Sequence, residues 1–273
     1  MSINAKTKLC CIIGNPVEHS LSPLMHNAGY KALGLNFVYM AFQISDVANA
    51  IAGIRALGIH GTSVTVPHKL TVMKYLDEID ETAKAIGAVN TIINDQAKLT
   101  GTNTDYEGAI RALEEKTKIE EKRVTVVGAG GAARAIAFGL KQKKAKIKII
   151  NRTKERAQAL AKEVRAEHGD LTDLSQIKNS DILIHATITG MHPDNKSLVP
   201  KEYLHKNLVV FDVVYNPRET KLINDAKKAG CQIVYGYKML LYQAVAQFEL
   251  FTGVKAPVEV MEEALLKGLA KHE

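Results

Sequence analysis

A glycine-rich turn between an apolar strand and a helix constrains this chain more than any other feature. Residues 123–134 read RVTVVGAGGAAR, so a β-branched run leads directly into Gly128-Ala129-Gly130-Gly131-Ala132. Glycines at such a turn let the backbone approach a pyrophosphate, which binds at the N-terminus of the following helix. The pattern predicts a Rossmann unit. Ala133 takes the position of the third glycine, where a small residue suffices for helix–strand packing.

A second apolar strand, predicted at 147–150, ends in Asn151-Arg152-Thr153, and Arg156 lies one helical turn further on. The end of this strand is where an Asp or Glu would bind the ribose 2′-hydroxyl of NAD. Here the side chains are arginines, whose guanidinium groups match phosphate oxygens. The sequence therefore predicts NADP(H) as the cofactor, with a solvated surface charge as the alternative interpretation of each arginine.

Strand and helix patterns alternate along the 273 residues, which predicts an α/β fold with parallel sheets and helices on both faces. Strands are predicted at 9–13, 37–44, 62–66, 89–93, 98–102, 124–127, 147–150, 181–186, 208–214 and 232–235. Helices are predicted at 24–33, 47–57, 106–116, 132–140, 153–167, 219–229, 238–251 and 258–269. A polar turn at Asn94-Asp95 separates the fourth and fifth strands.

Two domains fit this pattern best, because about 100 residues precede the Rossmann unit and must form a layer of their own. The turn-rich stretch 101–104 is the expected boundary. We therefore predict a substrate-binding catalytic domain with a parallel-rich sheet at 1–103 and a Rossmann NADP-binding domain at 104–238, with the active site in the cleft between them.

The composition is that of a globular protein, with 24% charged residues and no apolar run near the roughly 20 residues of a membrane span. The apolar stretch near the N-terminus is too short for a signal peptide, so we expect a cytoplasmic protein that binds no membrane. The net charge of +7 comes from scattered lysines without interleaved aromatic residues. It favours attraction of anionic small molecules over binding of nucleic acid.

The cysteines predict neither disulfides nor a metal site. Cys10, Cys11 and Cys231 are odd in number and lack framework spacing. No Cys/His spacing resembles a metal-binding motif, so no metal is expected.

Polar residues that could bind a ligand follow the first predicted strand. Ser22 precedes Pro23 and is explained locally as the N-cap of a helix. That explanation leaves Ser20 unassigned. Two hydroxyls at a helix N-terminus would also suit a carboxylate, which the helix dipole stabilises.

Further polar residues follow other predicted strands. Ser63 and Thr65 share one face of a strand, and Lys69 follows shortly after it. Asn90 lies at a strand start, and Asp105 lies where the chain leaves the first domain, although Asp105 is equally explained as an N-cap. An ammonium, a carboxylate and neutral hydrogen-bonding groups suit hydride transfer to a small polyhydroxylated acid. The carbonyl oxygen gains negative charge as hydride arrives and needs a cation or proton donor nearby.

Taken together, these motifs resemble the shikimate dehydrogenase family over essentially the whole chain. The matches in the first part are Ser20 with Ser22, the segment Thr65-Val66-Pro67-His68-Lys69, and Asn103-Thr104-Asp105. The matches in the second part are GAGGAA at 128–133, Asn151-Arg152-Thr153, residues 212–217 with Thr220, and Gly236, Met239, Leu240 and Gln243.

The resemblance implies reversible NADPH-dependent reduction of 3-dehydroshikimate to shikimate, a step toward chorismate and the aromatic amino acids. It implies that Lys69 and Asp105 form the catalytic pair. The residues implied for substrate binding are Ser20, Ser22, Ser63, Thr65, Asn90, Tyr215 and Gln243. The residues implied for cofactor binding are Gly128, Ala129, Gly130, Gly131, Ala132, Asn151, Arg152, Thr153, Arg156, Thr187, Val213, Gly236 and Met239. It further implies that helices at 239–273 return to the first domain, and that the protein is a monomer or a homodimer.

The chain departs from the family pattern at several positions. Ser63 stands where the family usually has Asn, so a substrate contact is lost or bridged by water. His185 stands in place of the Asn of an Asn-Ala-Thr-Ser/Pro segment near the nicotinamide, and Ile188 is also unusual. We interpret His185 as a packing or hydrogen-bonding substitute rather than a catalytic base. Phe251 replaces a frequent Trp and is expected in the core.

Three alternatives remain open. An NAD-dependent quinate/shikimate dehydrogenase is disfavoured by Arg152 and Arg156. A methylenetetrahydrofolate dehydrogenase is disfavoured by the serine pair together with Asn-Thr-Asp. A non-catalytic NADP-binding regulator would have no need of Lys69 and Asp105.

Overall fold

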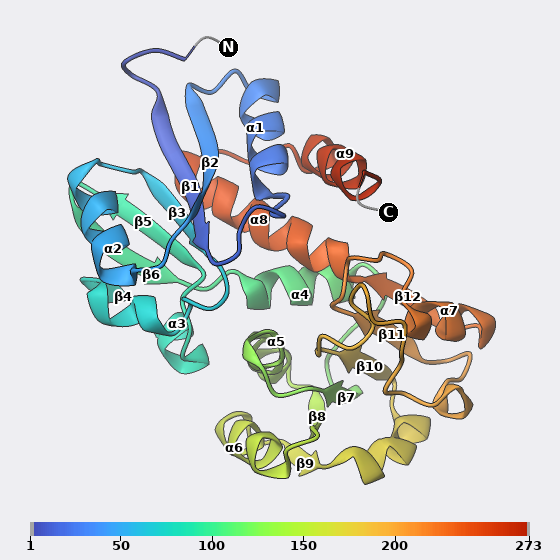
Figure 1. Cartoon of the computed structure of the whole chain (residues 1–273). Helices are drawn as coiled ribbons and strands as arrows, with labels where there is room; N and C mark the ends of the chain where they lie inside the picture. Colours follow the sequence, from blue (N-terminus) through green and yellow to red (C-terminus); the bar gives the residue numbers. More distant parts are fainter. Residues whose placement is uncertain (1–2, 272–273) are drawn as a thin grey trace. The chain divides into compact units, whose positions relative to one another are not determined.

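The computed structural model describes residues 3–271 and divides them into two compact units (Figure 1). The first unit contains the residues up to Thr104 together with Gln243–Lys271, and the second contains Asp105–Tyr242. The long helix α8 (Gly236–Thr252) therefore begins in the second unit and ends in the first.

The first unit is built on a six-stranded sheet of order β2-β1-β3-β5-β6-β4. Its strands are β1 (Lys8–Gly14), β2 (Phe37–Gln43), β3 (Gly61–Val64), β4 (Glu78–Ile79), β5 (Thr91–Asp95) and β6 (Lys98–Thr102). β1 pairs in parallel with β2 and β3, and β4 pairs in parallel with β6, but β3, β5 and β6 pair antiparallel. Three of the five pairings are parallel, so the predicted parallel-rich sheet is confirmed, although the alternation of strands and helices did not indicate the two antiparallel pairings. A tight turn at Gln96-Ala97, with φ of 49° and 71°, lets the chain reverse directly, two residues later than the predicted turn.

Helices from both ends of the chain cover this sheet: α1 (Ser22–Ala32), α2 (Val47–Ala56), α3 (Glu81–Ile86) and α9 (Val258–Leu269), with the 3-10 helix η1 (Thr71–Tyr75). α1 packs against α9, which lies beside it in Figure 1. Gly29 lets α8 pack closely against α1, because a β-carbon at this position would lie 2.8 Å from the Phe248 ring. Phe251 is buried, as predicted, against Gly61 of β3.

The second unit has a six-stranded sheet of order β12-β11-β10-β7-β8-β9, in which every pairing is parallel. Its strands are β7 (Arg123–Val127), β8 (Lys146–Ile150), β9 (Glu167–Gly169), β10 (Ile182–His185), β11 (Val209–Asp212) and β12 (Gln232–Tyr235). Its helices, besides the start of α8, are α4 (Asp105–Glu114), α5 (Gly131–Gln142), α6 (Lys154–Val164), η2 (Leu171–Asn179), η3 (Lys201–Tyr203) and α7 (Lys221–Lys228). This is the predicted Rossmann arrangement, in which the chain returns through helices between parallel strands.

One helix ends earlier than the sequence predicts. α6 stops at Val164 rather than Glu167, because Arg165 takes the left-handed conformation with φ of 60° and Glu167 already belongs to β9. Among residues 3–271, no helix combines the length and apolarity that crossing a membrane requires.

Candidate substrate and cofactor sites

Ser20 and Ser22 lie at the N-terminus of α1, but not as predicted. The cap position is Leu21, which provides no side-chain hydrogen bond, and Ser22 is already the first helical residue. The interpretation of Ser22 as an N-cap is therefore wrong. Ser20 Oγ instead accepts a hydrogen bond from the Ser22 backbone N–H at 3.3 Å. The Ser22 hydroxyl, which is nearly buried, hydrogen-bonds the Tyr39 phenol.

Ser63 sits inside a chain of buried hydrogen bonds that crosses the sheet of the first unit. The Tyr39 hydroxyl donates to Ser63 Oγ at 2.6 Å, and Ser63 Oγ donates to Gln247 Oε1 at 2.7 Å. Gln247 Nε2 donates in turn to Thr91 Oγ1 at 2.9 Å. Ser63 is only 3% exposed, so its hydroxyl serves this network and has one remaining acceptor site.

Asn90 joins the same network to the segment that precedes Asp105. Its Oδ1 accepts from the Thr104 backbone N–H at 2.8 Å and from the Thr91 hydroxyl at 2.7 Å, and its Nδ2 donates to Thr104 Oγ1 at 3.0 Å. Asp105, directly after Thr104, is the first residue of α4. The predicted Asn-Thr-Asp segment is thus fixed through its central threonine, and Asp105 is part of the helix rather than a residue preceding it.

The segment carrying Lys69 is bonded to the strand that leads to Asn90. The Lys69 carbonyl oxygen accepts from the Val89 N–H at 2.9 Å, and Lys69 is partly buried. Thr65, just past β3, donates its N–H to the Ile13 carbonyl oxygen, and its methyl group packs on Gly14, where a β-carbon would lie 2.3 Å away. The Gln243 carbonyl oxygen accepts from the Thr104 hydroxyl at 3.2 Å. The backbones bearing these candidate residues are therefore held in fixed register within the first unit.

Tyr215, the remaining substrate candidate, follows β11 in the second unit. Desolvation raises the pKa of its hydroxyl, although the side chain is only partly buried by accessible area.

The glycine-rich turn of the second unit has the geometry that a phosphate cradle requires. Gly128 has φ of 124°, and a β-carbon there would lie 2.4 Å from the Ala186 carbonyl oxygen, so only glycine fits. A β-carbon at Gly130 or Gly131 would instead meet nothing within 4 Å. Gly130 caps α5, whose first residue is Gly131, so no side chain covers the N-terminus of the helix at these two positions. This geometry fits a pyrophosphate.

Arg152 and Arg156 are exposed at the end of β8 and the start of α6. Within residues 3–271, neither guanidinium makes an ion pair or a side-chain hydrogen bond. Asn151 Nδ2 donates to the Thr153 carbonyl oxygen at 2.9 Å and so shapes the loop that presents Arg152. Two unpaired guanidinium groups in this position fit the 2′-phosphate of NADP(H).

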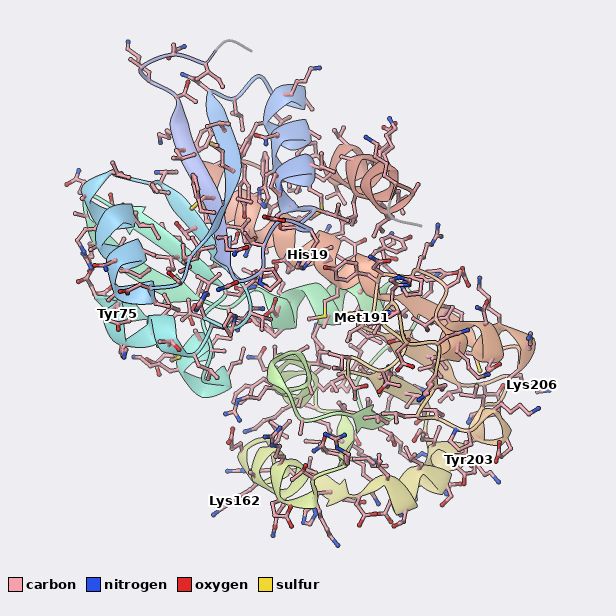
Figure 2. All side chains as sticks on the ribbon, in the orientation of Figure 1. His19, Tyr75, Lys162, Met191, Tyr203 and Lys206 are labelled. Carbon is pink, nitrogen blue, oxygen red and sulfur yellow. The ribbon has the colours of Figure 1, made fainter. Side chains whose placement is uncertain are left out.

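A pocket of about 550 Å³ in the second unit runs from Arg152 to the loop after β10. It is lined by Val127, Gly128, Asn151, Arg152, Leu171, Thr187, Ile188, Thr189, Met191, His192, Pro193, Asp194 and Leu198. Ile188 is 78% exposed although it is large and apolar. Met191, labelled in Figure 2, lies on this loop.

The other predicted cofactor residues lie where α8 begins. Gly236 is confined there, because a β-carbon would lie 2.5 Å from the carbonyl oxygens of Val213 and Val214. Met239 is buried one turn later. His185 hydrogen-bonds at both ring nitrogens, to Asp212 and Thr187, in agreement with its interpretation as a hydrogen-bonding substitute.

Two members of the substrate-side network, Tyr39 and Gln247, were missed from the sequence. Gln247 lies one helical turn after Gln243 on α8, and this spacing is the signal that could have identified it. Tyr39 lies inside an apolar strand, where nothing marks a hydroxyl as functional. No group of three or more His, Cys, Asp or Glu side chains that could hold a metal ion occurs in the described part of the chain.

Comparison with known proteins places these features in one family. The model of the shikimate dehydrogenase substrate binding domain matches residues 12–92, that of shikimate/quinate 5-dehydrogenase matches 111–230, and that of the shikimate 5′-dehydrogenase C-terminal domain matches 236–266. A shikimate dehydrogenase (NADP(+)) of Methanobrevibacter smithii is 46% identical over 98% of this chain and 99% of its own.

Solved structures agree with this assignment. A shikimate dehydrogenase in complex with NADP+ is 45% identical, covers 98% of both chains and superposes with a TM-score of 0.95. The enzyme of Thermus thermophilus, in complex with NADP(H) and shikimate, is 32% identical over 96% of this chain and 100% of its own, with a TM-score of 0.92. The fold, the ordered motifs and these similarities lead to one conclusion: the chain belongs to the shikimate dehydrogenase family.

Proposed function

We propose that the chain is an NADP-dependent shikimate dehydrogenase that reversibly reduces 3-dehydroshikimate to shikimate. The observation that carries this function is the identity of 46% over 98% of the chain to an enzyme named shikimate dehydrogenase (NADP(+)). The same observation favours this function over the quinate-specific, folate-linked and regulatory alternatives.

The substrate carboxylate binds the hydroxyls of Ser20 and Ser22 at the N-terminus of α1. Their placement supports this role, because both lie at the N-terminus of α1, where the helix dipole favours a carboxylate. Thr65, Asn90 and Gln243 bind the ring hydroxyls, with Tyr215 as a further contact. Ser63 contributes through the network it forms with Tyr39 and Gln247.

Lys69 and Asp105 are the catalytic pair. NADPH, when bound, supplies a hydride to the carbonyl carbon of 3-dehydroshikimate. The Lys69 ammonium stabilises the negative charge that develops on the carbonyl oxygen and gives it a proton, so the product is the neutral alcohol. Asp105 accepts hydrogen bonds from the substrate hydroxyl and the ammonium and thereby orients both. Lys69 regains its proton from water.

The cofactor is held by the second unit. Gly128 to Ala132 bind the pyrophosphate through backbone N–H groups of the turn and of α5. Arg152 and Arg156, with Asn151 and Thr153, bind the 2′-phosphate and its ribose. Thr187, Val213, Gly236 and Met239 line the nicotinamide end.

The compartment and the assembly state complete the proposal. We propose the cytoplasm, since the cysteines Cys10, Cys11 and Cys231 are all free thiols. The protein acts as a monomer or a homodimer on a small-molecule substrate.

The function is tested by incubating the purified protein with 3-dehydroshikimate and NADPH. We expect NADPH oxidation, followed by its absorbance, and stoichiometric shikimate identified by mass spectrometry. Cofactor reduction with quinate but not shikimate in the reverse direction would favour the quinate alternative. Tight NADP+ binding without turnover of any of these substrates would favour the regulator.

A further inference from the structure

His185, where the chain departs from the family pattern, is part of a buried hydrogen-bond chain that ends at the cofactor pocket. It is the last residue of β10 and lies directly opposite Asp212, the last residue of β11. Both side chains are at most 2% exposed. His185 Nδ1 lies 2.9 Å from Asp212 Oδ1, and Nε2 lies 2.7 Å from Thr187 Oγ1.

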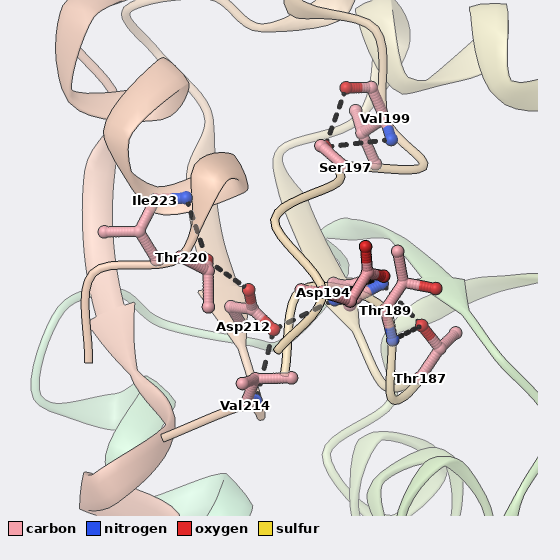
Figure 3. Close-up of polar contacts among 11 residues, drawn as sticks. Thr187, Thr189, Asp194, Ser197, Val199, Asp212, Val214, Thr220 and Ile223 are labelled. Atoms are coloured by element: carbon pink, nitrogen blue, oxygen red, sulfur yellow. Dashed lines mark hydrogen bonds and ion pairs between the residues drawn. The ribbon is translucent and has the colours of Figure 1, made fainter. Parts of the chain in front are cut away.

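The other partners of Asp212 fix the direction of the first hydrogen bond. The Thr220 hydroxyl, which accepts from the Ile223 N–H as the cap of α7, donates to Asp212 Oδ2 at 2.7 Å. The Val214 N–H donates to Oδ1 at 3.2 Å (Figure 3). A carboxylate that receives these hydrogen bonds is an acceptor, so His185 donates from Nδ1. In the neutral ring Nε2 then carries no proton and accepts from the Thr187 hydroxyl.

The remaining contacts of Thr187 leave it with one free lone pair. Its Oγ1 accepts from the Thr189 N–H at 3.1 Å (Figure 3), so its proton and one acceptor site are both in use. Its methyl group lies toward Gly128, where a β-carbon would be 3.2 Å away. Thr187 lines the 550 Å³ pocket together with Gly128, Asn151 and Arg152.

This arrangement resembles the Asp-His-hydroxyl order of hydrolases, but its details oppose a nucleophilic role. The N–H of Thr189 donates to the very oxygen that would attack, which reduces its nucleophilicity. The group is better suited to present a fixed acceptor to a ligand.

We propose that His185 is a positioning residue for NADP(H). Asp212 holds the ring, and Nε2 accepts the hydrogen bond that the Thr187 hydroxyl donates. The Thr187 oxygen is then left to act as a hydrogen-bond acceptor toward the pocket. Thr187 then binds a donor group of the cofactor, such as an amide N–H or a ribose hydroxyl, and disfavours phosphate oxygens. The inference rests on the proposed function only in taking NADP(H) as the ligand.

His185→Asn is the discriminating variant. The amide nitrogen of the new side chain takes the place of Nδ1 and keeps the Asp212 hydrogen bond, whereas nothing takes the place of Nε2. Thr187→Val removes the hydroxyl without touching Asp212, and Thr187→Ser is its control because it retains the hydroxyl. Binding of NADP+ to the full chain, without substrate, is measured by isothermal titration calorimetry, and thermal unfolding monitors the fold.

We expect His185→Asn and Thr187→Val each to weaken NADP+ binding about 3- to 10-fold, the range for one hydrogen bond. The double variant should bind no more weakly than Thr187→Val alone, because His185 acts through Thr187. Thr187→Ser should stay within about 2-fold of the wild type on the same reasoning. Wild-type binding by His185→Asn, or a His185→Asn effect that persists in full in the Thr187→Val background, would overturn the proposal.

Nitrogen-15 NMR of the histidine rings gives a readout that needs no variant to fold. For His185 of the wild-type protein at neutral pH, we expect a protonated Nδ1 and an unprotonated Nε2. A proton on Nε2, whether or not Nδ1 also carries one, would overturn the proposal. Neither measurement requires turnover, so the absence of 3-dehydroshikimate reduction by the wild type would count against the proposed function alone.

Discussion

The two units differ in the burial and the hydrogen bonding of the side chains proposed to bind ligands. In the first unit Ser63 and Asn90 are 3% and 2% exposed and belong to one network of side-chain hydrogen bonds. In the second unit Arg152 and Arg156 are exposed and, among the described residues, have no side-chain partner. Uncharged hydroxyls are recognised by direction, which requires fixed partners. A phosphate is recognised chiefly by its charge. An exposed arginine without a bound phosphate remains solvated, so leaving it unpaired costs little free energy.

This difference has an energetic basis. A buried polar group without a partner costs about 1–3 kcal/mol, so the substrate side must satisfy its hydrogen bonds before any ligand arrives. The exposed arginines carry no such requirement. Changes in the first unit should therefore alter stability or turnover, whereas changes at the arginines should alter cofactor binding alone.

The largest effect is expected at Lys69. Lys69→Ala should lower turnover of 3-dehydroshikimate about 10²–10⁴-fold, the range for a positioned acid–base group, with little change in KM for the substrate. Lys74→Ala, an exposed lysine on η1, is the matched control and should leave turnover unchanged. Steady-state kinetics measure both, and near-wild-type turnover by Lys69→Ala would remove the lysine from the mechanism.

A smaller effect, confined to the cofactor, is expected at Arg152. Arg152→Ala should raise KM for NADPH about 10- to 100-fold, the worth of a charge-assisted hydrogen bond, and leave KM for NADH unchanged. Lys162→Ala is the control, since Lys162 is an exposed cation on α6, the helix that follows Arg152, and points outward in Figure 2. An equal rise in KM for NADH would mean that Arg152 does not bind the 2′-phosphate.

His26 gives a further test of the buried polar groups in the first unit. Burial lowers its pKa from 6.5 to about 3, partly offset by the Gln247 side chain nearby, while the ring stacks on Tyr39 at 4.2 Å. Between these pH values the unfolded chain binds a proton that the folded chain does not. Stability should therefore fall as pH drops below 6.5, by about 1.4 kcal/mol per pH unit from this group.

His26→Phe keeps an aromatic ring and removes that proton. Urea unfolding of both proteins between about pH 6 and pH 4.5 should show a wild-type loss about 2 kcal/mol greater than that of the variant. Parallel pH profiles for the two proteins would contradict the assignment.

The smallest effect is expected at Ser63. Ser63→Ala leaves Gln247 Oε1 without its donor and Tyr39 without its acceptor, so the free energy of unfolding should fall by about 1–2 kcal/mol. Ser175→Ala, at an exposed position on η2, should change it by less than about 0.5 kcal/mol. Urea titrations distinguish the two, and equal stability of the Ser63 and Ser175 variants would mean that the network contributes nothing.

The same contrast explains what the sequence could predict. The Rossmann unit was predictable because its glycines and strands are local signals: Gly128 must have a positive φ wherever such a turn occurs. Polar residues at strand ends identified most candidates of the first unit, and the resemblance supplied their roles and added Gln243, but local reasoning misassigned Ser22 as a cap. The antiparallel pairing of β3 with β5 was not predictable from alternation alone, because residues 65–90 separate the two strands in the chain. The reversal between β5 and β6 depends on two residues, Gln96 and Ala97.

Long-range partners account for the rest. Gln247 reaches Ser63 across 184 residues, and no local pattern marks that pairing. His185 was recognisable as unusual, but its role depends on Asp212 and Thr187, which only the pairing of β10 with β11 and the following loop bring to it. Buried polar networks therefore require the fold to be known first, whereas exposed charges at strand ends do not.

The most direct test of the account compares kcat/KM for NADPH and NADH in the reduction of 3-dehydroshikimate by the wild-type protein. Arg152 after β8 and Arg156 on α6, which have no side-chain partner among residues 3–271, predict a preference for NADPH of about 10²-fold or more, as expected for two charge-assisted contacts to one phosphate. Equal efficiency with both cofactors, or a preference for NADH, would contradict the assignment of that site to the 2′-phosphate.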